Sequence, residues 1–256
     1  MERAQDAPGL VAPPATLATR LAPWVAALPR DCGERFRALY LHGSALTPRF
    51  DAQASDLNLL LVVTELPFDL LSTLARRVHA LVGHGQTGRR TAPLVLTEAQ
   101  IRSSIDVFPA EFLDLSARRS LLAGEDVLGG LAVGLGNLRH QCEYELRSKL
   151  VGLRQAYLGA GDVPDAAQRL LAQAAGGLAA VLRQLLVLRS SVPPDDPQDL
   201  VRAVAQLYGV DGAALGAPFA ARTNVNAPST QADAAFAALV RVLESLIQVV
   251  DAHSNP

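Results

Sequence analysis

Two stretches of the chain decide the fold: residues 41–44 read LHGS, and residues 55–63 read SDLNLLLVV. The first is a turn that closes an apolar run. The second is a nearly continuous apolar run, which is typical of a strand covered on both faces. Because side chains alternate along a strand, Asp56 and Asn58 should point to the same face. The sequence therefore predicts a Gly-Ser turn and a polar pair at one end of a buried sheet.

The turn and the polar pair have chemistry suited to a phosphate ligand. Gly43 allows the backbone to approach a phosphate closely, and the Ser44 hydroxyl can donate a hydrogen bond to a phosphate oxygen. Arg49, in the connection that follows, is a candidate contact for a triphosphate, and the alternative is a solvated loop arginine. Asp56 and Asn58 offer oxygen atoms of the kind that coordinate Mg²⁺.

This pattern resembles that of polymerase-beta-like nucleotidyltransferases, in particular the minimal bacterial members related to aminoglycoside nucleotidyltransferases. The resemblance covers about residues 35–125 and includes PAEF at residues 109–112 and LLAGED at residues 121–126. It implies a nucleoside triphosphate and Mg²⁺ as cofactors. In the family, two acids on one strand and a third from a neighbouring strand hold two ions, which align the triphosphate and activate the attacking hydroxyl. The resemblance implies that Asp56 is the first metal ligand and that Asn58 occupies the second position.

The chain departs from this family in its acids. An amide at position 58 brings no charge, whereas Mg²⁺ sites prefer carboxylates. The strand expected to carry the third acid, residues 91–96, reads TAPLVL and contains none. Losing one group that stabilises transition-state charge costs about 3–4 kcal/mol, a factor of roughly 10²–10³ in rate. The sequence therefore predicts a pseudoenzyme that retains nucleotide or phosphate binding.

Three acids beyond that strand are candidates to replace the missing charge. Glu98 lies just past the strand, and Glu111 and Asp114 lie on a fourth strand predicted at residues 111–115. Glu111 is the preferred substitute, so the candidate catalytic residues of an active protein are Asp56, Glu111 and Asp114. The alternative is that these acids are surface charges or partners of neighbouring arginines.

Strand and helix signals come in blocks along the chain, which indicates an α+β fold. Residues 1–14 are expected to form a flexible leader. Residues 15–130 are expected to form a nucleotidyltransferase-like domain with a mixed sheet flanked by helices, and residues 131–256 an all-α bundle of about four main helices. The expected strands are residues 36–41, 57–63, 93–96 and 111–115, and the expected helices are residues 16–28, 68–82, 98–105, 138–158, 165–188, 198–208 and 231–250.

Composition excludes several classes of function. The 256-residue chain has a formal net charge of −2 and no patch of basic and aromatic residues, so we do not expect nucleic acid as a partner. Polar residues interrupt the apolar run at residues 170–188, and the N-terminus lacks a basic start followed by an apolar run. We therefore expect no membrane span and no signal peptide. Cys32 and Cys142 lack metal-ligand spacing and are typical of a cytoplasmic protein.

Three functions remain compatible with the sequence. The leading one is a catalytically impaired nucleotidyltransferase-fold protein that binds a nucleotide or phosphate ligand in a regulatory or binding role. The first alternative is an active Mg²⁺-dependent enzyme that moves a nucleoside monophosphate to a small-molecule or protein hydroxyl. The second is an oligomerising scaffold with helices 170–188 and 234–250 as its interface. The helical domain offers a surface for a protein partner or a homodimer.

Overall fold

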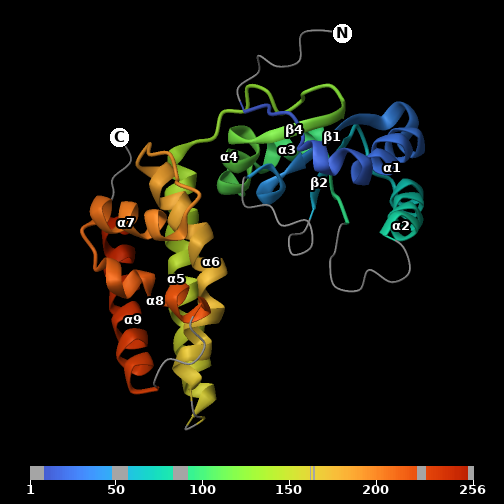
Figure 1. The fold of residues 1–256 in the computed structure, drawn as a ribbon. Helices are drawn as coiled ribbons and strands as arrows, with labels where there is room; N and C mark the ends of the chain where they lie inside the picture. The colour runs from blue at the N-terminus through green and yellow to red at the C-terminus, as the bar shows by residue number, and fades with distance from the viewer. Residues whose placement is uncertain are drawn as a thin grey trace. The chain divides into compact units, whose positions relative to one another are not determined.

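The computed structural model describes residues 9–47, 57–82, 92–161, 163, 165–223 and 229–252. The chain divides into two compact units, Met1–Val133 and Gly134–Pro256. The first contains a mixed sheet flanked by helices, and the second is helical throughout its described elements (Figure 1). The fold class is α+β, as the blocks of strand and helix signals predicted.

The first unit is built on a sheet that has four strands within the described part of the chain, in the order β3-β2-β1-β4. The strands are β1 (Phe36–His42), β2 (Asn58–Val63), β3 (Leu94–Thr97) and β4 (Arg119–Gly124). β1 is antiparallel to both β2 and β4, whereas β2 and β3 run parallel. The two strands that adjoin the LHGS turn and Asn58 are therefore the central pair of the sheet.

Each face of the sheet has its own helical layer, because side chains alternate along β1 and β2. One face packs against α1 (Ala15–Cys32) and α2 (Phe68–Val82), and the other against α3 (Glu98–Ser104) and α4 (Pro109–Ala117). This double cover explains why β2 is apolar and buried after its first residue. The side chains toward α1 and α2 include Leu39, Leu41, Leu59, Leu61 and Val63, and those toward α3 and α4 include Ala38, Tyr40, Leu60 and Val62.

The strand predicted at residues 111–115 is wrong, because this segment lies within α4. Pro109 occupies the first turn of the helix, where its missing N–H and fixed φ are tolerated. Phe112 and Leu115, three residues apart, are buried on one side of the helix. The fourth strand is β4, which begins at Arg119. Short apolar runs do not distinguish a strand from a helix, and here the proline at the start was the better signal.

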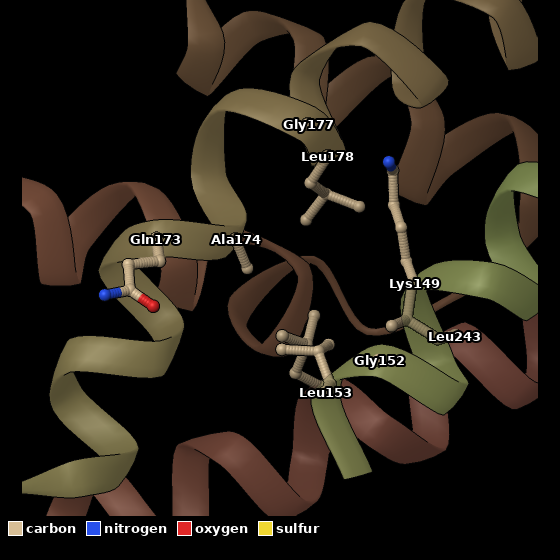
Figure 2. Close-up of a pocket in the computed structure, with 9 residues that line it drawn as sticks. Lys149, Gly152, Leu153, Gln173, Ala174, Gly177, Leu178 and Leu243 are labelled. Carbon is tan, nitrogen blue, oxygen red and sulfur yellow. The ribbon is translucent and has the colours of Figure 1, made fainter. Parts of the chain in front are cut away.

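The second unit consists, in its described residues, of five helices. They are α5 (Leu135–Ala160), α6 (Ala166–Leu188), α7 (Pro197–Tyr208), α8 (Gly212–Thr223) and α9 (Ser229–Asp251). The predicted turn before α7 is present, and the Asp196 side chain accepts hydrogen bonds from the first N–H groups of that helix. The helix α8, which is short and has an internal proline, was not predicted from the sequence. Helices α5, α6 and α9 line a cavity of about 230 Å³ (Figure 2).

Helix α6 has the length and apolar character of a membrane span: it has 23 residues, and an 18-residue window within it has a mean hydropathy of 1.5. The core helix of a compact bundle meets the same criteria. α6 contacts α5, α7, α8 and α9, and Leu182, Leu185 and Leu186 are fully buried in the bundle. Its packing in this structure is that of a core helix.

A buried ion pair ties the edge of the sheet to the loop that follows it. Arg119 is 1% exposed and Asp126 is 15% exposed, and the guanidinium donates two hydrogen bonds to the carboxylate at 3.0 and 2.5 Å. The Tyr40 hydroxyl donates a further bond of 3.0 Å to Asp126. The backbone of Arg119 pairs with Gly9 and Val11, so this part of the expected leader lies beside β4.

We predict that Asp126→Asn destabilises the first unit by about 3–5 kcal/mol, because it leaves the Arg119 charge buried without a counter-charge. Burial acts to raise the pKa of Asp126, but the hydrogen bonds from Arg119 and Tyr40 lower the pKa below its ordinary value. The stabilisation is therefore present above about pH 4 and is lost as pH falls through the lower folded-state pKa. Urea unfolding followed by fluorescence of Trp24, the single tryptophan, should show wild type and variant converging from pH 5 toward pH 2.

The matched control is Glu65→Gln in the exposed pair with Arg35, where the side chains are 64% and 42% exposed. We expect this change to alter stability by less than about 1 kcal/mol. Equal effects of the two substitutions would show that the Arg119–Asp126 pair has no special structural role.

Candidate functional site

The end of β1 is the point at which the predicted polar residues meet. His42, the last residue of β1, pairs with Asn58 on β2 and with Arg119 on β4. Directly opposed residues of antiparallel strands point to the same face, so these three side chains share the face that α3 and α4 cover. The candidate site is therefore this edge of the sheet, together with the Gly43 turn.

The Asn58 amide packs directly on Gly43. Gly43 has φ +74° and begins a 3-10 turn over Gly43–Leu46. A Cβ atom at position 43 would lie 2.7 Å from the Asn58 Nδ2 atom, which is closer than such atoms approach one another. Position 43 therefore requires glycine for two reasons: its backbone has a positive φ, and a Cβ atom there would collide with the Asn58 amide. Asn58 is itself exposed, so its amide is open to a ligand.

His42 does not supply a positive charge to this site at neutral pH. The side chain is half-buried at the centre of the strand end. Burial lowers the pKa of His42 below its ordinary value, so the imidazole is neutral at pH 7. A neutral ring can donate or accept a hydrogen bond, but it does not neutralise a phosphate.

Three of the predicted site residues are not fully described. Asp56 and Arg49 lie outside the described residues, and only the backbone of Ser44 is described, within the 3-10 turn. The roles predicted for these residues stay predictions. The described part of the site consists of Gly43, Asn58 and their neighbours.

Glu98 lies at the opposite end of the sheet from Asn58. β3 is parallel to β2, with Leu94 beside Leu60 and Thr97 beside Val63 at the far end. Glu98 follows Thr97, where its carboxylate accepts a hydrogen bond from Arg37. Glu98 is thus separated from Asn58 by the length of β2.

No residue of β3 pairs with Asn58, because the pairing of β2 with β3 begins at Leu60 and Leu94. Continuing the parallel register two residues back from Leu94 brings Ala92 level with Asn58. The lack of an acid in residues 91–96 is visible in the sequence, but the position level with Asn58 can be found only from the strand register. β3 itself reads LVLT and supplies no carboxylate to this edge.

The other two candidate acids lie on helix α4. Both Glu111 and Asp114 are exposed and each has an interaction with another group. α4 ends at Ala117, just before β4 begins beside His42. Asp114 is one turn from that end, whereas Glu111 is about 9 Å away along the helix axis. Asp114 is therefore the better placed of the two.

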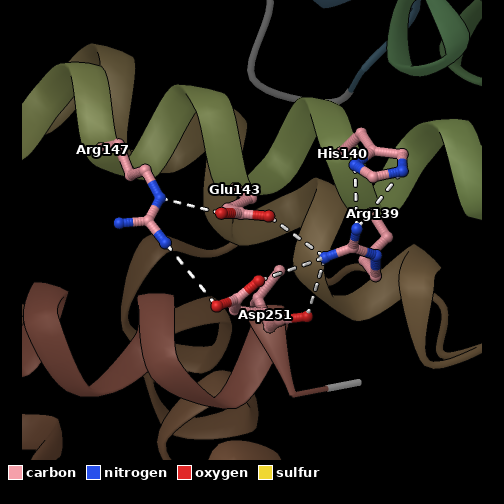
Figure 3. Close-up of polar contacts among 6 residues, drawn as sticks. Arg139, His140, Glu143, Arg147 and Asp251 are labelled. Carbon is pink, nitrogen blue, oxygen red and sulfur yellow. Dashed lines mark hydrogen bonds and ion pairs between the residues drawn. The ribbon is translucent and has the colours of Figure 1, made fainter. Parts of the chain in front are cut away.

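The basic residues of α5 are engaged in ion pairs within the second unit. The Glu143 carboxylate accepts hydrogen bonds from Arg139 at 3.1 Å and from Arg147 at 2.8 Å. Asp251 at the end of α9 faces the same two arginines, at 4.0 and 3.7 Å (Figure 3). These contacts join α5 to α9, and their geometry is that of a structural network.

The described donor set does not fit a pair of Mg²⁺ ions. No group of three or more His, Cys, Asp or Glu side chains that could hold a metal occurs among the residues that the structure describes. Asn58 offers a neutral oxygen, and neither Ala92 nor Glu98 supplies a carboxylate to it. A pair of divalent ions requires several carboxylates or phosphate oxygens around it.

Comparisons with known proteins show the fold. No protein-family model matches the chain, and no curated protein matches it either. A similar solved structure is that of spectinomycin adenyltransferase AAD(9) from Enterococcus faecialis, determined with ATP and spectinomycin. The two chains are 10% identical, the match covers 88% of this chain and 98% of the other, and the TM-score is 0.55. The likeness supports the nucleotidyltransferase fold predicted from the sequence.

We predict that Gly43→Ala lowers the free energy of unfolding by more than the backbone strain alone. A non-glycine residue at positive φ costs about 1–2 kcal/mol, and the added methyl group also displaces the Asn58 amide. The control is Gly130→Ala, at φ +81° with no atom within 4 Å of the new methyl group. Urea unfolding followed by Trp24 fluorescence measures both. Equal losses in the two variants would show that the Asn58 contact does not constrain Gly43.

Proposed function

We propose that this chain is a nucleotidyltransferase-fold protein that binds a nucleotide or phosphate ligand at the Gly43–Asn58 edge and has lost most metal-dependent catalysis. The observation that carries the proposal is the packing of a neutral amide on Gly43. Extending the β2–β3 register two residues beyond its last pair would bring Ala92, which has no carboxylate, level with Asn58. The proposed role of the protein is therefore binding or regulation, without group transfer.

Electrostatics supports the loss of catalysis. Two divalent cations about 4 Å apart repel one another, and an active site holds them with several carboxylates. Of the predicted polar pair, only Asp56 is an acid, and it lies outside the described residues. Removing a single charge-stabilising group already costs about 3–4 kcal/mol of transition-state stabilisation. The absence of two such groups is expected to prevent the second ion from binding.

The same substitution favours an anionic ligand without metal. A carboxylate repels a phosphate unless a cation lies between them, whereas an amide N–H donates a hydrogen bond to a phosphate oxygen. The Nδ2 atom of Asn58 adjoins the Gly43 turn, where the predicted phosphate contacts lie. The similar fold of an adenyltransferase determined with ATP supports a nucleotide as the ligand class.

We predict that wild-type protein binds ATP, GTP or CTP with an affinity that Mg²⁺ does not increase. Asn58→Asp should weaken metal-free binding by about tenfold or more, because it places a carboxylate beside the phosphates, and Mg²⁺ should restore the binding. Isothermal titration calorimetry with and without Mg²⁺ measures both effects. The control is Gln155→Glu, the same amide-to-carboxylate change at an exposed position of α5.

Two other outcomes would replace the proposal with its rivals. Binding that requires Mg²⁺, followed by release of pyrophosphate, would identify an active transferase in which Asp114 is the first residue to test. Absence of any nucleotide binding would favour a scaffold. For that role the apolar faces of α6 and α9 already pack within the bundle, so the interface would have to use other residues.

A further inference from the structure

The second unit contains a cavity that the proposed function does not use. Its volume is about 230 Å³, and side chains from three helices line it (Figure 2). A dry cavity of about 150 Å³ in a protein core holds a benzene molecule, so this one has room for a somewhat larger ligand. The lining residues are Lys149, Gly152 and Leu153 on α5, Gln173, Ala174, Gly177 and Leu178 on α6, and Leu239 and Leu243 on α9.

Small residues create this space. Gly152 on α5 and Gly177 on α6 lie in helix interiors, where each glycine costs about 1 kcal/mol relative to alanine. A methyl group at position 152 would meet no atom within 4 Å. Gly152 and Gly177 are both exposed, so glycine at these positions leaves the cavity open to solvent, where a larger side chain would favour the helix and cover it.

The floor and the border of the cavity differ in chemistry. Leu178, Leu239 and Leu243 are fully buried and form an apolar floor. Lys149 runs along the border, and its ammonium lies beside Gly177, 3.1 Å from where a methyl group there would be. An apolar floor with one cation at its border is complementary to an amphipathic anion.

The Lys149 ammonium retains capacity for a second partner. It donates to Glu145 at 3.1 Å, and its side chain is 25% exposed. An ammonium carries three donors, and Glu145 is the partner that the described residues provide. A ligand carboxylate at the border would accept a remaining donor, and the partial burial of Lys149 strengthens such a charge-assisted bond.

We propose that this cavity binds a small monocarboxylate whose apolar body is a short alkyl chain or a single aromatic ring. The apolar body lies on the leucine floor, and the carboxylate accepts a hydrogen bond from Lys149. This site lies within the helical unit and is independent of nucleotide binding at the Gly43–Asn58 edge.

The test is calorimetric titration of the full chain with sodium octanoate and with 1-octanol, which share an apolar body and differ in charge. Wild type should bind octanoate saturably and more tightly than octanol. Gly152→Leu fills the cavity and should weaken octanoate binding by about tenfold or more. Gly159→Leu is the matched control, because it lies on the same helix, also meets open space and does not line the cavity. This variant should bind octanoate like wild type.

A second variant tests the assigned carboxylate contact. Lys149→Met keeps a long apolar side chain and removes the ammonium, so it should weaken octanoate binding by about tenfold while leaving octanol binding unchanged. Absence of saturable octanoate binding to wild type would overturn the site. Equal binding of octanoate and octanol, or equal effects of Lys149→Met on both, would overturn the carboxylate assignment. Equal effects of Gly152→Leu and Gly159→Leu would show that octanoate binds elsewhere.

Discussion

The antiparallel register of β1 and β2 determines which side chains meet at the candidate site. Because His42 is opposite Asn58, the residue after His42 lies close to the Asn58 side chain. That residue is Gly43, with a positive φ and no room for a Cβ. A one-residue slip would turn Asn58 to the other face and place apolar side chains at the edge. The register thus determines which chemical group a ligand at the turn would meet.

On the other side of β1, Arg119 of β4 is held in place by both backbone and side-chain hydrogen bonds. Arg119 uses its backbone to pair with Gly9 and Val11, and it uses its side chain to bind Asp126 and the Ser116 carbonyl. Its positive charge is therefore committed to the structure. The site receives a neutral imidazole from His42 on β1 and a neutral amide from Asn58 on β2. This environment suits hydrogen bonding to an anion better than coordination of clustered cations.

Most helices and strands of this fold could be predicted from the sequence, and the elements that could not be predicted have physical explanations. Residues 57–63 and 68–82 gave clear signals, because a doubly covered strand is uniformly apolar and an amphipathic helix repeats every 3.6 residues. The short apolar pattern of α4 fits both a strand and a helix, and the proline in its first turn is the feature that distinguishes the helix. The position of Ala92 and the remoteness of Glu98 depend on strand pairing, which a single sequence does not encode locally.

We infer that the Gly43–Asn58 edge carries too little negative charge for a pair of divalent ions. Electron paramagnetic resonance of Mn²⁺ bound to wild-type protein with a non-hydrolysable ATP analogue counts these ions. We expect at most one Mn²⁺ per chain, with no coupling between ions. Two magnetically coupled Mn²⁺ ions per chain would contradict the account and indicate that the site assembles the charge of an active transferase.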